Sequence, residues 1–263
     1  MRSDMSAVPV PQPTTDKAAI RRILNRDRDW SLYALADLDD GLFEHCDWLL
    51  TGDALALVFR AIAIRPIFVL GGAAAVRALL AALPCESGYL NLKPYQLEAA
   101  GGIFHFHERH EMHRMILDDF VPRPGITEPL TLANLPEIAR LYASGDGGGI
   151  AFAPFQLETG MFRGIRRAGE LVAVGGVQVV SRQESVAAVG NIFTHPACRG
   201  AGLAQTVTSA VVAAARDAGI STIGLNVASS NAAAIRAYER IGFATRFRYF
   251  EGPAGRVSES DAP

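Results

Sequence analysis

The segment best suited to chemistry is a glycine-rich loop at the start of a predicted helix, Arg199-Gly200-Ala201-Gly202-Leu203-Ala204. The strand before it ends at His195-Pro196, because proline cannot continue the hydrogen-bond ladder. The first N–H groups of a helix have no partner within it, and they lie at the positive end of its dipole. Glycines let an anion approach these groups, and Arg199 adds a positive charge. The loop therefore predicts a phosphate or pyrophosphate site.

Two common nucleotide-binding loops do not fit this segment. A nucleoside triphosphate loop ends in Gly-Lys-Ser/Thr, where this chain has Gly202-Leu203-Ala204. A dinucleotide loop needs a third glycine at the position of Gln205 and an acid near the end of the next strand, where Val227 and Ala228 stand. A tight strand–helix turn without a ligand is the remaining alternative at this point.

A second pattern follows at a fixed distance from the loop: Asn231, Ala234, Tyr238 and Gly242-Phe243. The two patterns resemble the signatures of the GNAT superfamily of N-acetyltransferases, Arg/Gln-x-x-Gly-x-Gly/Ala and Asn-x-x-Ala-x-x-x-Tyr-x-x-x-Gly-Phe. The stretch Asn191-Ile-Phe-Thr-His-Pro also reads like the fourth strand of that family. The resemblance covers roughly residues 128–252, about half of the chain.

The resemblance implies acetyl-CoA (coenzyme A) as a cosubstrate and no metal. In the family, the fourth and fifth strands splay apart and the pantetheine arm enters between them like an extra strand. Backbone groups of the fourth strand would bind the pantetheine amides, the loop would hold the pyrophosphate, and an asparagine would orient the pantetheine arm. The residues implied are, in that order, Ile192, Phe193 and Thr194; Arg199, Gly200, Ala201, Gly202, Leu203 and Ala204; and Asn231.

The resemblance also puts Tyr238 near the acyl sulfur, where its phenol could protonate the leaving thiolate. The alternative for Tyr238 is a tyrosine packed on the sheet with a satisfied hydroxyl. The predicted fourth strand contains no acid, so the general base is assigned to Glu158, in the segment that lines the acceptor site in relatives. Glu184, and Asn191 or His195 acting through water, are the alternatives.

The implied mechanism is direct attack of an amine on the thioester, without a covalent enzyme intermediate. Cys198 lies beside the phosphate loop and away from the expected sulfur, so we expect it to be a bystander.

A run of histidines, His105-Phe-His-Glu-Arg-His-Glu-Met-His113, suggests a metal site as a third class of function, a metal-dependent hydrolase. Zinc proteases use His-Glu-x-x-His, and His107-Glu108-Arg109-His110 is one residue short of it. If the run is a strand, His105, His107 and His113 share one face and His110 takes the other. A polar strand face is the interpretation that we favour.

Local patterns predict individual elements. Thr14, Thr15 and Asp16 can cap a helix through Leu24, and Asn134 caps a helix through Ile138 and Leu141. Strands are predicted at Ile103–Leu117 and Glu170–Ser181, and a loop at Gly145–Gly149. A long helix is predicted at about Gly200–Ala218, because Leu203, Val207, Val211 and Ala214 recur at helical spacing.

The order of predicted elements is that of an α+β (mixed α/β) fold: a GNAT fold with a mixed, mostly antiparallel sheet flanked by helices, preceded by a second GNAT-like domain. Strand Ile67–Leu70, Gly71-Gly72 and a following helix mimic the strand–glycine–helix unit without its arginine. This half resembles the degenerate first domain of tandem GNAT proteins and would bind no CoA. Two prolines and a glycine in Val121–Gly125 mark the predicted domain boundary. The predicted parts are a flexible tail (1–15), the GNAT-like domain (16–121), a linker (122–127), the catalytic domain (128–252) and a second tail (253–263).

Composition restricts the partners. The net charge is −2 and 49% of the residues are hydrophobic, with basic and acidic residues mixed, so we expect no nucleic-acid partner. No apolar run reaches membrane-spanning length and no signal peptide is evident, which predicts a cytoplasmic protein without membrane partners. Three widely spaced cysteines form no disulfide framework. We therefore predict an N-acetyltransferase acting on a primary amine of a small molecule or peptide, as a monomer or homodimer. The alternative is a non-catalytic acyl-CoA-binding regulatory protein.

Overall fold

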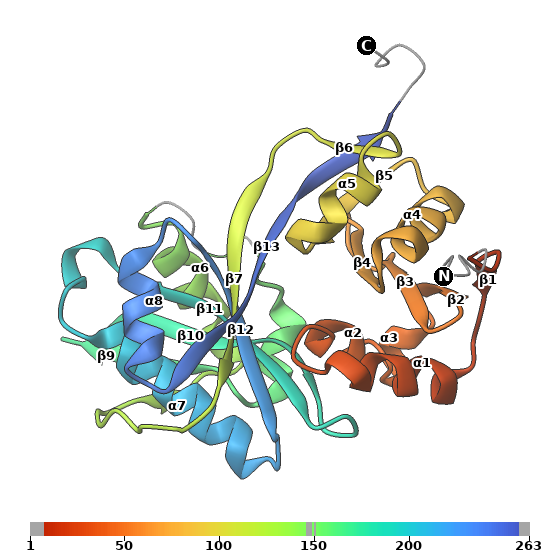
Figure 1. The fold of residues 1–263 in the computed structure, drawn as a ribbon. Coiled ribbons are helices and arrows are strands. Elements are labelled where there is room, and N and C mark those ends of the chain that lie inside the picture. Colours follow the sequence, from red (N-terminus) through yellow and green to blue (C-terminus); the bar gives the residue numbers. More distant parts are fainter. Residues whose placement is uncertain (1–7, 146–148, 150, 258–263) are drawn as a thin grey trace. The chain divides into compact units, whose positions relative to one another are not determined.

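The computed structural model describes residues 8–145, 149 and 151–257 (Figure 1). They form two compact units: unit 1 comprises the described residues up to Met112 and from Phe247 onward, and unit 2 those from His113 to Arg246. The chain passes between the units along strands β7 (His110–Leu117) and β13 (Phe243–Arg256), which both cross the division. Parts of the predicted tails (1–7 and 258–263) and of the predicted loop Gly145–Gly149 (146–148) lie outside the described residues.

Unit 1 is a mixed sheet with helices. Its α-helices are α1 (Lys17–Leu24), α2 (Leu32–Ala36), α3 (Asp40–Phe43), α4 (Ala73–Ala82) and α5 (Leu97–Ala100). Its strands are β1 (Gln12–Pro13), β2 (Cys46–Thr51), β3 (Ala54–Phe59), β4 (Pro66–Leu70), β5 (Ser87–Leu92), β6 (Phe104–Phe106) and the end of β13. The sheet order is β1-β2-β3-β4-β5-β13, with β6 also paired to β13. Asp16 begins α1 by accepting the N–H groups of Ala18 and Ala19, as predicted for a cap.

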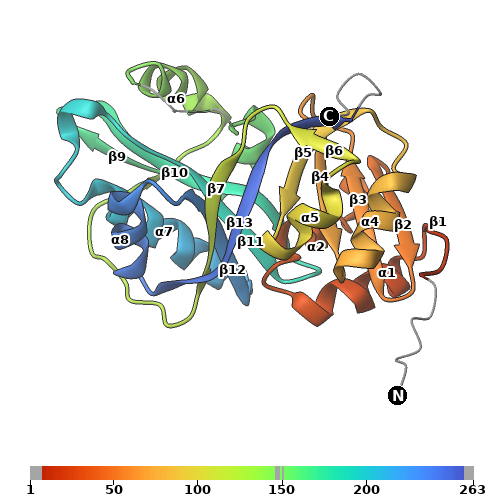
Figure 2. The ribbon, with the colours of Figure 1, turned by 45° about the horizontal axis from the view of Figure 1, so that its top comes forward.

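Unit 2 has the same kind of architecture. Its α-helices are α6 (Leu135–Tyr142), α7 (Leu203–Asp217) and α8 (Ala232–Glu239). Its strands are β8 (Glu128–Pro129), β9 (Arg163–Arg167), β10 (Glu170–Ser181), β11 (Val186–Thr194), β12 (Thr222–Ala228), most of β7 and the start of β13. Short 3₁₀ helices include η2 (Pro94–Gln96) in unit 1 and η4 (Pro154–Thr159) and η5 (Pro196–Cys198) in unit 2. The sheet order is β13-β7-β12-β11-β10-β9-β8, with α6 on one face and α7 and α8 on the other (Figure 2).

The two units repeat one strand order. In each, three antiparallel strands (β2-β3-β4 and β9-β10-β11) are followed by a helix, α4 or α7, that crosses to a parallel strand, β5 or β12. A further helix, α5 or α8, comes next. The mixed, mostly antiparallel sheet flanked by helices is the predicted fold class, which is confirmed.

Two irregularities in unit 2 shape its sheet. The pairs Val174–Phe193 and Gly176–Gly190 leave Gly175 opposite two residues of β11, a β-bulge at Asn191 and Ile192. A second shift leaves Gln178 as an extra residue of β10. Parallel pairing of β11 with β12 runs from Val186–Thr222 to Val189–Leu225 and goes no further, although both strands are described in full. The two strands therefore separate toward their carboxyl ends.

The predicted strand Ile103–Leu117 is wrong in its middle. The chain forms β6 and β7 with a break at His107–Arg109, where the carbonyl of Glu108 lies so close to Gly252 that a Cβ there would be 2.0 Å away. The alternating histidine face predicted for this run is therefore not formed. Likewise, Pro253–Arg256 of the predicted C-terminal tail pairs with β5 and β6 as the end of β13, and Gln12–Pro13 of the N-terminal tail pairs with β2.

The proline-containing segment Val121–Gly125 is not where the compact units divide. The N–H groups of Val121 and Arg123 donate to Ile241 O and to Ser209 Oγ. The Arg123 guanidinium donates to Arg240 O. These bonds fix the segment within unit 2, so prolines that interrupt regular structure do not here mark a domain boundary.

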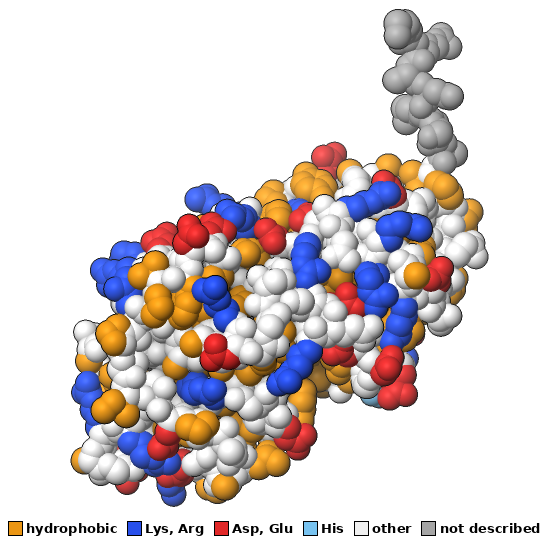
Figure 3. Space-filling model, turned by 90° about the horizontal axis from the view of Figure 1, so that it is seen from below, with side chains coloured by type: hydrophobic (Ala, Val, Ile, Leu, Met, Phe, Trp, Pro, Cys, Tyr) orange, Lys and Arg blue, Asp and Glu red, His pale blue; other side chains and the backbone are white. Residues whose placement is uncertain are grey.

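Within the described residues, no helix has the length and apolarity needed to cross a membrane. On the face drawn in Figure 3, Lys and Arg side chains are interspersed with Asp and Glu side chains.

Candidate active site

The loop Arg199–Ala204 joins β11 to α7 in unit 2. Gly200 and Gly202 have φ of +81° and +77°, and neither has a neighbour within 4 Å of where a Cβ would be. Both positions therefore favour glycine because of their backbone conformation and not for lack of space, since other residues rarely adopt positive φ. Gly202 is the N-cap of α7 and contributes no side-chain cap.

The backbone N–H groups from Gly200 through Gln205 donate to no described residue; the first donor of this region is the N–H of Thr206, to Gly202 O. A run of unpaired N–H groups at a helix N-terminus is an anion site by both hydrogen bonding and dipole. The chemistry of this donor set fits the pyrophosphate of CoA.

Arg199 stays near this run. Its Nε donates to Thr194 O at 3.3 Å, and its guanidinium lies 5.8 Å from the centroid of the Phe193 ring. The side chain is exposed, so its charge remains available to an anion at the loop.

The strand segment predicted to pair with pantetheine lies at the separated end of β11. Phe193 is buried and packs edge-on against Tyr142, with ring centroids 5.7 Å apart. Ile192 fills the space beside Gly175, where a Cβ would lie 2.4 Å from its Cδ1. The Thr194 hydroxyl is buried and has no hydrogen-bond partner among the described residues. The side chains of Ile192 and Phe193 thus belong to the packing of unit 2, while β12 leaves the backbone of this segment unpaired.

Asn231 and Tyr238 lie at opposite ends of α8. Asn231 is its N-cap, and its Oδ1 accepts the N–H of Ala234 at 3.1 Å. Tyr238 is half-buried, packs against Phe243 with centroids 6.1 Å apart, and its hydroxyl bonds no described residue. Burial raises the pKa of Tyr238 to about 12. Its phenol is therefore protonated at neutral pH and is a proton donor, not a base.

The residues predicted as candidate general bases, Glu158, Glu184 and His195, lie in different segments of unit 2. Glu158 is exposed on η4 and makes no hydrogen bond or ion pair with any described residue. Glu184 is buried in the turn before β11, whose nine residues put it about 25 Å from the phosphate loop at a strand rise of about 3.3 Å per residue. His195 accepts the Ala197 N–H at its Nδ1, which assigns the proton of the neutral ring to Nε2.

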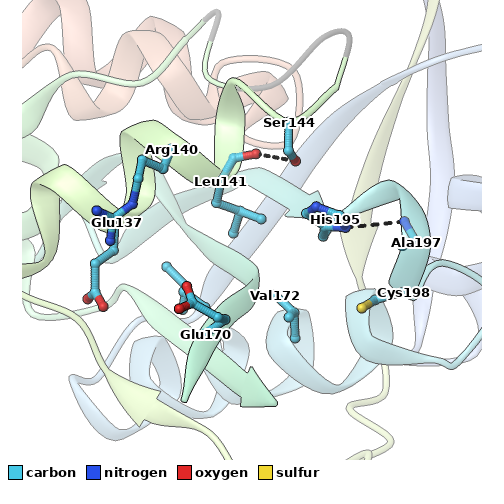
Figure 4. Close-up of a pocket in the computed structure, with 10 residues that line it drawn as sticks. Glu137, Arg140, Leu141, Ser144, Glu170, Val172, His195, Ala197 and Cys198 are labelled. Carbon is cyan, nitrogen blue, oxygen red and sulfur yellow. Dashed lines mark hydrogen bonds between the residues drawn. The ribbon is translucent and has the colours of Figure 1, made fainter. Parts of the chain in front are cut away.

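A cavity of about 380 Å³ lies next to the loop, between α6, the start of β10 and η5 (Figure 4). Arg140, Glu170, His195 and Cys198 are among its lining residues, and neither the glycines of the loop nor Tyr238 belongs to it. The Cys198 thiol is free and half-buried at this wall. The cavity is therefore a neighbour of the anion site and not the site itself.

Sequence reasoning missed two polar groups of unit 2. Arg114 of β7 is buried and donates through Nε to Asn226 Oδ1 at 3.0 Å, just beyond the last pair of β11 with β12. Gln156 of η4 is buried and bonds Asn191 of the bulge at 2.9 Å. Pro154 followed by Gln156 at the third position of a helix is a capping signal that points to the second group.

The histidine run forms no metal site among the described residues, where no group of three or more His, Cys, Asp or Glu side chains could hold an ion. His105 and His107 pack edge-on in unit 1, with centroids 4.7 Å apart. In unit 2, His113 Nδ1 lies 3.3 Å from Thr245 Oγ1.

Unit 1 has a position that corresponds to the segment of β11 predicted to pair with pantetheine, and there a side chain bonds the strand. β4 and β5 pair only over Pro66–Phe68 and Tyr89–Asn91. Beyond these pairs, the indole Nε1 of Trp30 donates to Val69 O at 3.3 Å. Trp30 is fully buried, with its ring centroid within 6 Å of those of Phe68, Phe247 and Tyr249.

Comparisons with known proteins agree with this geometry. Residues 133–243 match the model of the acetyltransferase (GNAT) family. A search of curated protein sequences finds no match.

Solved structures of similar fold span nearly the whole chain. A putative acetyltransferase of the GNAT family from Novosphingobium aromaticivorans is 22% identical, with a TM-score of 0.58, over 88% of this chain and 99% of its own. A GCN5-related N-acetyltransferase from Kribbella flavida is 17% identical, with a TM-score of 0.61, over 87% and 96%. A tandem GNAT protein from the clavulanic acid biosynthesis pathway is 12% identical, with a TM-score of 0.53, over 95% and 99%.

At these identities the structural likeness shows the fold and nothing finer, whereas the family model identifies the domain. Residues 133–243 of this chain are a domain of the acetyltransferase (GNAT) family, in a chain whose fold is shared with a tandem GNAT protein.

Proposed function

We propose that this protein is an N-acetyltransferase that transfers an acetyl group from acetyl-CoA to a primary amine of a small molecule or peptide. The observation that carries the proposal is the run of unpaired N–H groups from Gly200 through Gln205 at the positive end of α7. It lies at the end of two strands that separate, and the family match supports acyl transfer in general.

The pyrophosphate of CoA binds to this run, with Arg199 adding charge. The pantetheine arm pairs with the backbone of Ile192, Phe193 and Thr194, which β12 leaves free. Asn231 has its Oδ1 engaged as a cap, so its Nδ2 is the group left to orient the arm.

The reaction is direct attack. The unprotonated amine nitrogen forms a bond to the thioester carbonyl carbon, and the carbon–sulfur bond breaks as the intermediate collapses. Tyr238 gives its proton to the leaving thiolate, since its raised pKa keeps the phenol protonated. Glu158 takes the proton of the amine, directly or through water. A monomer or homodimer in the cytoplasm is the setting that we predict.

The test is CoA release from acetyl-CoA in the presence of a panel of primary amines, small and peptidic, with binding of CoA measured separately by calorimetry. Turnover with any amine supports the proposal. CoA binding without turnover on the whole panel favours the non-catalytic acyl-CoA-binding protein, and the absence of CoA binding contradicts both.

A further inference from the structure

Two β-bulges lie side by side in unit 2, and each leaves backbone groups without a regular ladder partner. Asn191 lies in the bulge of β11 and has a φ of +56°, a conformation that asparagine tolerates better than most residues. Gln178 is the extra residue of β10. Because buried backbone groups must be hydrogen-bonded, each bulge needs partners from outside the sheet.

The partners are two buried side chains from the same face. Gln156 Nε2 donates to Gln178 O at 3.1 Å and to Ala151 O at 3.2 Å. Its Oε1 accepts Asn191 Nδ2 at 2.9 Å and the Ala153 N–H at 3.0 Å. The Tyr142 hydroxyl donates to Asn191 O at 2.9 Å, and burial raises its pKa, which keeps it a donor.

All the hydrogen-bonding capacity of the Gln156 amide is therefore used. One side chain joins both bulges to η4, the segment that also carries Glu158. The bulge comprises Asn191 and Ile192, and it lies within the part of β11 beyond Val189 that β12 leaves unpaired.

We propose that Gln156 is a positioning residue: it fixes the bulge at Asn191, and through the bulge it sets the conformation in which Ile192, Phe193 and Thr194 meet acyl-CoA. This inference rests on the proposed function, because the separated end of β11 is taken to hold the pantetheine arm. It adds that one amide joins η4, through the bulge, to the strand segment proposed to meet acyl-CoA.

The chain offers a matched control. The run Pro-aromatic-Gln-Leu-Glu occurs twice, at 94–98 and at 154–158. Gln96 is also buried and caps its own 3₁₀ helix, accepting the Lys93 N–H at 2.9 Å as Gln156 accepts that of Ala153. Gln96 joins no bulge and lies in unit 1. Gln156→Met and Gln96→Met thus remove the same cap, and only the first releases the bulges.

The experiment has two arms. In the first arm, amide hydrogen exchange over β11 is compared between the ligand-free wild type and each variant. In the second arm, the dissociation constant of each protein for CoA alone is measured by calorimetry. For Gln156→Met we expect faster exchange in η4, whose cap is lost, and in β11 and its neighbour β10, with CoA binding weakened about tenfold. For Gln96→Met we expect both to match the wild type. If Gln156→Met does not fold, Tyr142→Phe removes one hydroxyl from the same bulge and takes its place, with a smaller loss in the same direction.

The proposal is overturned if Gln156→Met behaves as Gln96→Met does, or if exchange rises evenly across unit 2 while the folded protein keeps its CoA affinity. A wild-type protein that does not bind CoA refutes the proposed function instead, and the exchange arm alone then decides whether Gln156 fixes the bulge.

Discussion

Tyr238 is the residue on which the proposed chemistry depends most. Its hydroxyl bonds no described residue, its ring packs against Phe243, and burial raises its pKa to about 12. Tyr238→Phe keeps the ring packing and removes the proton donor. We expect kcat to fall about 10²-fold, the typical share of a general acid, with the KM for acetyl-CoA nearly unchanged.

The pH dependence follows from the direction of the same shift. A phenol with a raised pKa is in its active, protonated form at every pH below about 12. The wild-type rate should therefore show no decline due to this group between neutral pH and pH 10. A Tyr238→Phe protein with unchanged kcat would remove Tyr238 from the mechanism.

At the scale of elements, helix α7 carries a left-handed glycine at each end. Gly202 is its N-cap with a φ of +77°, and Gly219 follows its C-cap with a φ of +83°; neither position is crowded. Alanine in this conformation costs about 1–2 kcal/mol. Gly202→Ala and Gly219→Ala should therefore lower stability by similar amounts, as measured by urea unfolding.

The two substitutions should differ in ligand binding. Gly202 lies within the run of free N–H groups and Gly219 does not. We expect Gly202→Ala to weaken CoA binding about tenfold or more in calorimetry, a loss of about 1.4 kcal/mol or more. Gly219→Ala should leave the affinity for CoA unchanged. Equal affinities in the two variants would mean that the loop does not hold the pyrophosphate.

The elements of unit 2 were predictable because their patterns are local. The strand Glu170–Ser181 was predicted with the bounds of β10, and helical spacing predicted α7. The backbone of the glycine loop before α7 was predictable for the same reason, since its glycines and its helix are adjacent in sequence. The sequence could not predict the bulges at Asn191 and Gln178, because they depend on how two strands align and on side chains from other elements.

Long-range contacts explain what else was not predicted. The predicted strand Ile103–Leu117 is interrupted where Glu108 closely approaches Gly252, a residue far away in sequence. Asn134 is the N-cap residue of α6, as predicted, but its side chain makes no cap bond to the helix and its Oδ1 accepts the Thr131 N–H instead. In both cases the local sequence allows more than one conformation or hydrogen-bond partner, and contacts with other residues accompany the one that is formed.

At the scale of the whole molecule, the repeated strand order of the two units raises the question of how many acyl-CoA molecules one chain binds. Unit 2 has the run of N–H groups without a partner among the described residues, and the end of β11 that β12 leaves unpaired. Unit 1 has the equivalent helix, α4, after Gly71-Gly72, and its Gly72 N-cap is preceded by no arginine. The carbonyl of Val69 that a pantetheine amide would need is already bonded by Trp30.

The expected stoichiometry is therefore one CoA per chain, because an incoming arm in unit 1 would have to displace a fully buried tryptophan packed among three aromatic rings. Calorimetric titration of the full chain with CoA checks this by its molar ratio at saturation. Titration of Gly202→Ala, which alters only the loop of unit 2, is the control and should weaken the whole of the signal. A second binding event that survives in Gly202→Ala would show that unit 1 takes CoA despite Trp30, and it would make the first unit a site in its own right.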